Sequence, residues 1–106
     1  MHPSTEVALR TLRRRIGKEV EILSDLESRF KEEYFRRKCK FAIQDVEAAE
    51  TMFLRPLETE TWRTPADEAR TLACAESVFQ FGVLTRTQLQ DIMQKWGPSV
   101  IAVPSN

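Results

Sequence analysis

Apolar residues recur every three or four positions along the first half of the chain, the spacing of a helix that buries one face. The first stripe consists of Leu9, Leu12, Ile16, Val20, Leu23, Leu26, Phe30 and Tyr34. A second stripe has the same spacing, with its phase shifted by one residue: Phe35, Cys39, Ala42, Val46, Ala49 and Phe53. Because no proline interrupts residues 4–54, the pattern predicts helix over almost the whole first half.

An unbroken helix over this region would be about 75 Å long, whereas a compact domain of this size has a radius of gyration near ~13 Å. We therefore expect a break. The stretch SDLE has the spacing of a capping box, with Ser24 as cap, and Gly17 is a weaker candidate for a bend. The prediction is two helices, 5–23 and 25–54, capped first by Ser4 or Thr5. A continuous coiled-coil helix in an oligomer is the alternative.

Arg55-Pro56 predicts the end of the second helix, because the residue before a proline is pushed out of the helical region. Leu57 and Trp62 are then expected to pin a connector to the core. TPADEA marks a new helix start, with Thr64 as cap and Pro65 in the first position.

Gly82 is predicted to end this third helix, and Thr85 with Gln88 has the spacing of a capping box for a fourth. The expected helices are 65–81 and 86–96, the latter stopped by Gly97-Pro98. The fold prediction is all-α: one domain over residues 1–106, built as a compact bundle of about four helices. Trp62 and Trp96 are expected to close its edges, and the apolar tail VIAV to lie against its body.

Composition excludes several classes of function. Apolar residues make up 42% and charged residues 30%, and 16 basic residues balance 16 acidic ones, which describes a globular chain without the basic excess of a generic nucleic-acid binder. His2 is the one histidine, Cys39 and Cys74 are expected as buried free thiols, and no glycine-rich phosphate loop occurs. We therefore expect no enzyme activity, no cofactor and no metal site. The N-terminal stretch MHPSTEVALRTLRRR has no apolar signal core, so a cytoplasmic location is expected.

Charged residues cluster in two regions. A basic helix face is expected from Arg10, Arg14, Arg15 and Lys18, with Arg13 at its margin. Carboxylates gather later, where residues 44–54 contain no basic side chain. If the connector folds back, one negative surface forms from Asp45, Glu47, Glu50, Glu58, Glu60, Asp67 and Glu68. This acidic set is the predicted partner-binding surface, because it resembles a phosphate backbone to a protein that grips DNA. The basic face is the alternative.

The stretch FQFGVLTRTQLQDIM has the punctuation of a helix-turn-helix, with Arg86, Gln88 and Gln90 as candidate base readers. Residues 56–106 carry only four basic side chains against six acidic ones, so the phosphate contacts that normally supply affinity are missing. We therefore interpret the stretch as a helical corner, with Phe79, Val83, Leu89, Ile92 and Met93 inward and Arg86 and Gln90 facing solvent.

The chain resembles the small type I anti-CRISPR proteins of phages and mobile elements. The resemblance covers the whole chain and rests on its size, on eleven arginines against five lysines, and on the helical segments TLRRRIGKEVEILSDLESRF and TLACAESVFQFGVLTRTQLQDIM. No shared motif carries it. It implies a non-enzymatic inhibitor, with a type I-E inhibitor as the specific expectation, that binds a CRISPR surveillance complex or its recruited helicase–nuclease stoichiometrically.

Two other classes stay open: a small helix-turn-helix-like regulator that binds nucleic acid, and a helical protein that assembles into oligomers. The expected partner is a protein rather than nucleic acid or a membrane. The expected oligomeric state is a monomer or a homodimer.

Overall fold

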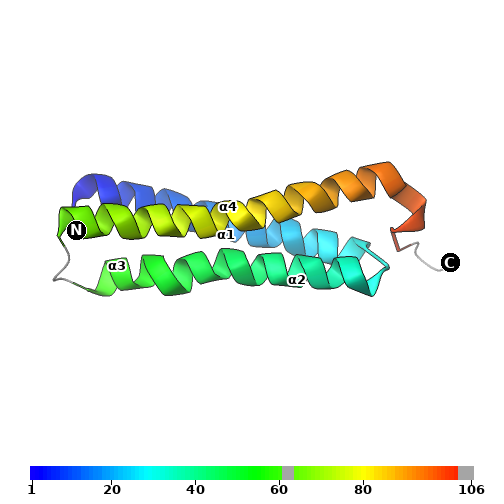
Figure 1. Ribbon diagram of the computed structural model, residues 1–106, viewed down its shortest axis with the longest axis horizontal. Coiled ribbons are helices and arrows are strands. Elements are labelled where there is room, and N and C mark those ends of the chain that lie inside the picture. Colours follow the sequence, from blue (N-terminus) through cyan, green and yellow to red (C-terminus); the bar gives the residue numbers. More distant parts are fainter. Residues whose placement is uncertain (61–63, 103–106) are drawn as a thin grey trace.

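The computed structural model describes residues 1–60 and 64–102. Over these residues the chain forms three helical rods packed side by side, in a body of 57 × 22 × 19 Å (Figure 1). The elements in chain order are α1 (Pro3–Arg29), α2 (Glu33–Ala48), η1 (Ala49–Leu54), α3 (Arg55–Thr59), α4 (Pro65–Trp96) and η2 (Gly97–Ser99). α2, η1 and α3 follow one another in the middle rod. The all-α prediction is confirmed, whereas the prediction of four helices is wrong, because three rods are formed.

α1 runs through Ser24, so the predicted break at the SDLE capping box is wrong. Leu23 and Leu26 lie on one buried stripe with Phe30, and a break at residue 24 would have taken them off the same face. Burial of the continuous stripe outweighs a cap that offers only about 1 kcal/mol. Gly17 is also helical and exposed. The helix begins at Pro3, two residues earlier than predicted: His2 is its cap, and its Nδ1 accepts a hydrogen bond from the backbone N–H of Ser4.

The break between the first two rods falls at residues 30–32. The backbone of Phe30 turns extended there, and its ring is buried at 1% exposure. The C-terminal segment holds this turn: the N–H of Lys31 donates to the carbonyl of Val100, and the N–H of Ala102 donates to that of Arg29, each at 2.8 Å. The prediction that the apolar tail lies against the body is confirmed for Val100, which is buried, and Ile101, which is half-buried.

The middle rod continues past Arg55-Pro56, where the sequence predicts a stop. The six residues of η1 form a π-helix immediately before the proline. A proline lacks the N–H for the helical hydrogen bond and crowds the carbonyl four residues earlier, and the wider π turn relieves both conflicts. Leu54 and Leu57 are buried on the continuing face, so burial favours keeping the rod intact. Leu57 does reach the core, but from a helix rather than from a connector.

α4 is one helix through Gly82, so the predicted corner is wrong. Gly82 has no positive φ and lies where α4 crosses α2 most closely. A Cβ on Gly82 would overlap the Cγ2 of Val46 and come within 3.2 Å of the carbonyl oxygen of Ala42. The glycine therefore permits a close approach between helices, and does not terminate one.

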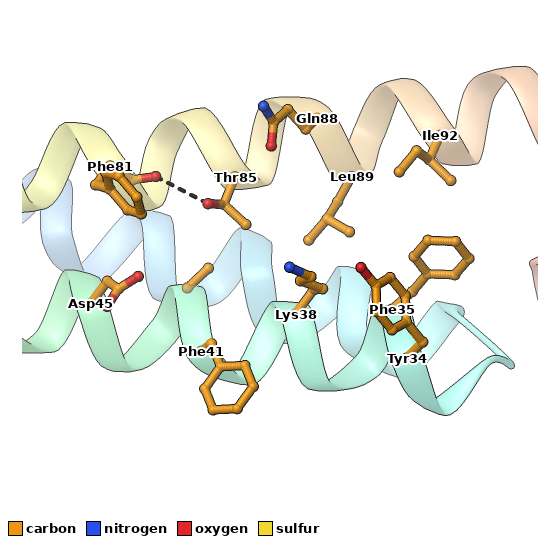
Figure 2. A pocket seen from close by; sticks show the side chains of 11 residues that line it. Tyr34, Phe35, Lys38, Phe41, Asp45, Phe81, Thr85, Gln88, Leu89 and Ile92 are labelled. Atoms are coloured by element: carbon orange, nitrogen blue, oxygen red, sulfur yellow. Dashed lines mark hydrogen bonds between the residues drawn. The ribbon is translucent and has the colours of Figure 1, made fainter.

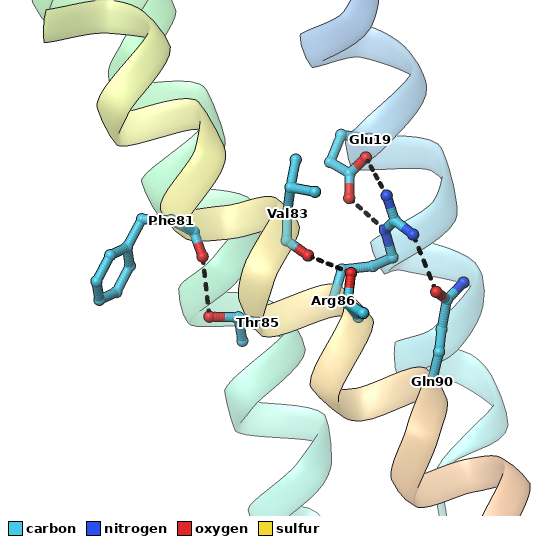
Figure 3. Close-up of polar contacts among 7 residues, drawn as sticks. Glu19, Phe81, Val83, Thr85, Arg86 and Gln90 are labelled. Atoms are coloured by element: carbon cyan, nitrogen blue, oxygen red, sulfur yellow. Dashed lines mark hydrogen bonds and ion pairs between the residues drawn. The ribbon is translucent and has the colours of Figure 1, made fainter.

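The predicted capping box at Thr85 and Gln88 is also absent. The Thr85 hydroxyl instead donates to the carbonyl of Phe81 at 3.1 Å, one helical turn back (Figure 3). Such back-bonding satisfies a threonine inside a helix without ending it.

The ends of α4 agree with the prediction. Thr64 caps the first turn and forms a reciprocal capping box with Asp67, with Pro65 in the first turn. Gly97, at φ 37°, closes the last turn before Pro98. Trp96 does not close the core, because its side chain is 62% exposed. Trp62 lies outside the described residues.

The core consists of two buried clusters along the bundle. The larger cluster joins residues of α1, the middle rod and α4 around Leu12, Val46 and Phe79. The smaller cluster surrounds Phe30, Cys39 and Met93, next to the turn at 30–32. Each of these side chains is at most 7% exposed.

Candidate protein-docking groove

A groove with an apolar lining runs between α2 and α4 on the side away from α1 (Figure 2). Phe81 and Asp45 lie at one end, Thr85 and Phe41 in the middle, and Ile92 at the other end. The lining residues are Tyr34, Phe35, Lys38, Phe41, Ala42, Asp45, Phe81, Thr85, Gln88, Leu89 and Ile92.

Three aromatic side chains at this groove are exposed to solvent. Tyr34 is 65% exposed, Phe41 60% and Phe81 65%. The neighbouring Leu84 on α4 is 56% exposed. Single exposed apolar side chains are ordinary on a protein surface, but a contiguous patch of large ones is the usual mark of an interaction site.

The helical spacing explains why these rings do not join the core. On α2 the positions 34, 38, 41 and 45 follow one another in steps of four and three, and so form a stripe of their own. The buried stripe of the same helix is Cys39, Ala42 and Val46. The outer stripe is therefore a second, separate face, distinct from the two apolar stripes that the sequence predicts.

Polar groups in the groove are few and differ in charge. The Nζ of Lys38 lies 5.5 Å from the centre of the Tyr34 ring, a cation–π contact. Asp45 is half-buried and lies beside Phe81, seven residues after Lys38 on the same helix. Neither Lys38 nor Asp45 forms an ion pair with another described residue.

Ion pairs between the rods are distributed unevenly. α1 is joined to the middle rod by Arg13, which binds Glu50 at 3.0 Å and Glu58 at 2.7 Å, and by Glu27 with Lys40 at 3.6 Å. Glu19 of α1 binds Arg86 of α4. Across residues 1–60 and 64–102, no ion pair joins α2 to α4. The groove is thus the one seam of the described bundle without a bridging charge pair.

The structure gives the members of the predicted acidic set different partners, and it brings Glu50 and Glu58 together on Arg13. Glu50 and Glu58 face Arg13, so their charge is partly compensated. Glu68 is buried, and its carboxylate accepts a hydrogen bond from the backbone N–H of His2. The Met1 amino group lies 3.8 Å from the same carboxylate. These members contact their own chain, and a partner-binding role for them stays a prediction.

The remaining acidic residues have other surroundings. Asp67 serves the cap of α4 and Arg70, and Asp45 lies in the groove. Glu47 is exposed, and Glu60 follows the end of α3.

Three members of the alternative basic face keep their charge free. Arg10, Arg14 and Lys18 are exposed on α1 and form no ion pair with a described residue. Arg15 instead covers the ring of Phe79, with its guanidinium carbon 4.8 Å from the ring centre.

Arg86 is not a solvent-facing base reader. Its Nε and Nη2 donate to the two oxygens of Glu19 at 2.5 and 3.2 Å, and its Nη1 donates to Gln90 (Figure 3). Glu19 is only 5% exposed. The prediction that Arg86 and Gln90 face solvent is therefore wrong for Arg86, which is half-buried, and confirmed for Gln90, which is exposed. The inward assignment of Phe79, Leu89 and Met93 is confirmed, while Val83 and Ile92 are half-buried.

The hydrogen bonds from Arg13 to Glu50 and Glu58 raise the pKa of Arg13, and the same contact lowers the pKa of Glu58. Burial, with a smaller contribution from the nearby charge of Glu27, raises the pKa of the Cys39 thiol to about 11. The prediction of two buried thiols holds for Cys39 but not for Cys74, which is exposed.

No group of three or more histidine, cysteine, aspartate or glutamate side chains within the described ranges is arranged to hold a metal ion. None of the helices described is both long and apolar enough to cross a bilayer. Comparison with known proteins found no matching family model, no similar curated protein and no similar solved structure.

Proposed function

We propose that this chain acts without catalysis, by stoichiometric binding to another protein chain, and that the α2–α4 groove is its docking surface. The observation that carries the proposal is the row of exposed aromatic side chains Tyr34, Phe41 and Phe81 along a seam that no ion pair between described residues bridges. The packing of the core does not require these rings, since the buried stripes lie on other faces of the same helices.

Burial of aromatic surface is the largest favourable contribution that such a groove offers to a partner. Each ring removed from water contributes roughly 1.5–3 kcal/mol, and aromatic side chains dominate the energetics of protein interfaces. Lys38, Asp45 and Gln88 at the groove supply polar groups that fix the register of a bound chain.

The specific target that we propose is a type I CRISPR surveillance complex or the helicase–nuclease that it recruits. Support comes from the resemblance of the whole chain to small helical anti-CRISPR proteins. The groove adds a surface suited to protein binding. A role as a helical assembly protein is the second candidate, favoured by the same open seam. A base-reading role is disfavoured, because Arg86 is held by Glu19.

An interference assay with a type I-E system tests the proposal. The double variant Phe41→Ser/Phe81→Ser removes the rings at the groove, and we expect it to lose inhibition at least tenfold in the amount of protein required. The matched control is Val7→Ser/Trp96→Ser, which removes two equally exposed apolar side chains elsewhere and is expected to inhibit like the wild type.

Each result decides a different part of the proposal. Full inhibition by the groove variant would show that the docking surface lies elsewhere, with the charge reversal of Glu47, Glu50 and Glu58 as the next variant. Absence of inhibition by the wild type would remove the proposed target. Circular dichroism of each variant checks that the helices are intact.

A further inference from the structure

The polar groups of the α2–α4 groove are arranged so that the groove complements itself. Lys38 and Asp45 lie seven residues apart on α2, about 10 Å along the helix, with Phe41 between them. A half-turn about an axis that lies in the plane of the contact, perpendicular to α2 and near the level of Phe41, brings Lys38 of one copy opposite Asp45 of the other. The charges at the two positions are opposite.

The same half-turn also exchanges the apolar ends of the groove. Phe81 lies at the Asp45 end, while Tyr34, Phe35 and Ile92 lie at the other (Figure 2). Two grooves facing each other in this antiparallel orientation set α4 against α4, so the Phe81 ring of one copy lies toward the Ile92 end of the other. An isologous contact requires this kind of match, in which residue i meets residue j and j meets i.

We infer that a second copy of this chain docks on the α2–α4 groove, antiparallel about a twofold axis, with Lys38 of each copy facing Asp45 of the other. The inference rests on the proposed role of the groove as a docking surface. The inference names the bound partner as a second copy of the chain. α2 and α4 of each copy then form a four-helix contact, which covers the exposed rings.

Two further observations favour a second copy as the occupant. Both charged groups are free to make the contact, because neither is in an ion pair with a described residue. The formal net charge of the chain is zero, so two copies approach without the repulsion that a charged protein opposes to its own association. A protein target at this groove would have to displace the second copy, so self-association and target binding compete for one surface.

A charge-exchange experiment tests this contact on the isolated full chain. The wild type is expected to sediment as a dimer of the 12.3 kDa chain. Lys38→Glu alone brings two carboxylates together at both symmetry-related contacts, and Asp45→Lys alone brings two ammonium groups together there. Like charges at a contact cost several kcal/mol, so each single variant is expected to dissociate on the order of 100-fold more readily.

An equimolar mixture of the two single variants restores the contact. In the mixed dimer the carboxylate introduced by Lys38→Glu in one chain faces the ammonium group introduced by Asp45→Lys in the other. At the second contact the unchanged Asp45 faces the unchanged Lys38, so both pairs attract. The mixture is expected to sediment as a dimer, as is the double variant Lys38→Glu/Asp45→Lys. The matched controls Lys18→Glu and Glu21→Lys change the same charges on the exposed face of α1 and are expected to leave the dimer intact.

Three results would overturn the inference: a monomeric wild type, single variants that remain dimers, or a mixture that remains monomeric. The proposed function has a separate test: it fails if the variant Phe41→Ser/Phe81→Ser inhibits as well as the wild type. A monomeric wild type together with a groove variant that loses inhibition would leave the docking role standing and remove only the second copy. Helical circular dichroism of each single variant ensures that dissociation is not unfolding.

Discussion

The groove between α1 and α4 and the groove between α2 and α4 share one helix, yet their coverings differ. In the first, Arg15 lies over the Phe79 ring and Arg86 bridges to Glu19, so charged side chains of the chain itself cover the apolar surface. In the second, Lys38 contacts the Tyr34 ring, but Tyr34, Phe41 and Phe81 all remain exposed to solvent. Long basic side chains cover apolar surface with their stems while their charge stays hydrated. The difference between the two grooves supports the proposal that the exposed rings of the α2–α4 groove dock a partner.

Loss of the covering ion pair is expected to have the largest effect on stability. Arg86→Met leaves the buried Glu19 carboxylate without its partner, and we expect a loss of about 2–4 kcal/mol in the free energy of unfolding measured in urea. Lys95→Met, which removes an exposed partner of Asp91 on the same helix, is the control and should cost less than about 0.5 kcal/mol.

The double variant Glu19→Leu/Arg86→Met sharpens this test, because it removes both charges. It should recover most of the lost stability. If it is as unstable as Arg86→Met alone, the stems and not the charges close the α1–α4 groove.

The close contact between α2 and α4 at Gly82 gives the next effect. Gly82→Ala places a Cβ into Val46, and we expect a net loss of about 1–2 kcal/mol by thermal or urea unfolding. Gly17→Ala is the matched control: its Cβ meets no atom within 4 Å, so the better helix propensity of alanine should stabilise the chain by about 0.5–1 kcal/mol.

A Val46→Ala background should reduce the cost of Gly82→Ala, since the overlapping methyl group is gone. Equal effects of alanine at Gly17 and Gly82 would contradict the close crossing of α2 and α4.

The smallest expected effect on stability comes from the contact between α1 and the middle rod. Arg13 lowers the pKa of Glu58, so this contact stabilises the fold above the ordinary glutamate value of 4.5 and is lost as pH falls through the lowered pKa. Melting temperatures of the wild type should therefore fall more steeply below pH 4.5 than those of Glu58→Gln. The control is Glu47→Gln, at an exposed residue without an ion pair among the described residues; its melting temperature should fall with pH as that of the wild type does. If the melting temperature of Glu58→Gln also falls as steeply as that of the wild type, the effect of Arg13 is contradicted.

Periodicity was sufficient to predict the helical class, the buried stripes of α1 and α2, and the start of α4 at Thr64. The largest errors in the fold concern where helices end. Local signals at Ser24, Pro56 and Gly82 contribute about 1–3 kcal/mol each, whereas the stripes on either side of them bury several large side chains. Tertiary packing therefore decided these positions.

The candidate groove was the least predictable part of the molecule. The sequence indicates Phe41 and Phe81 only as apolar residues on helices, and which face each helix turns to solvent depends on how the three rods pack. The partner of Arg86 was equally inaccessible, because Glu19 is 67 residues away in the chain. Charge counts alone directed attention to carboxylates that the fold pairs with Arg13 and with the N-terminus.

The hydrogen bonds that close the turn at residues 30–32 also set an order of events during synthesis. Their partners, Val100 and Ala102, are translated about 70 residues after the turn. At roughly 5–20 residues per second, the nascent α1 and α2 wait about 4–14 seconds for the segment that fixes their junction. During that interval Phe30 and Cys39 lack the residues of α4 and of the C-terminal segment that cover them. The nascent chain therefore leaves this apolar surface uncovered, and the junction becomes fixed only after residues 100–102 have been made.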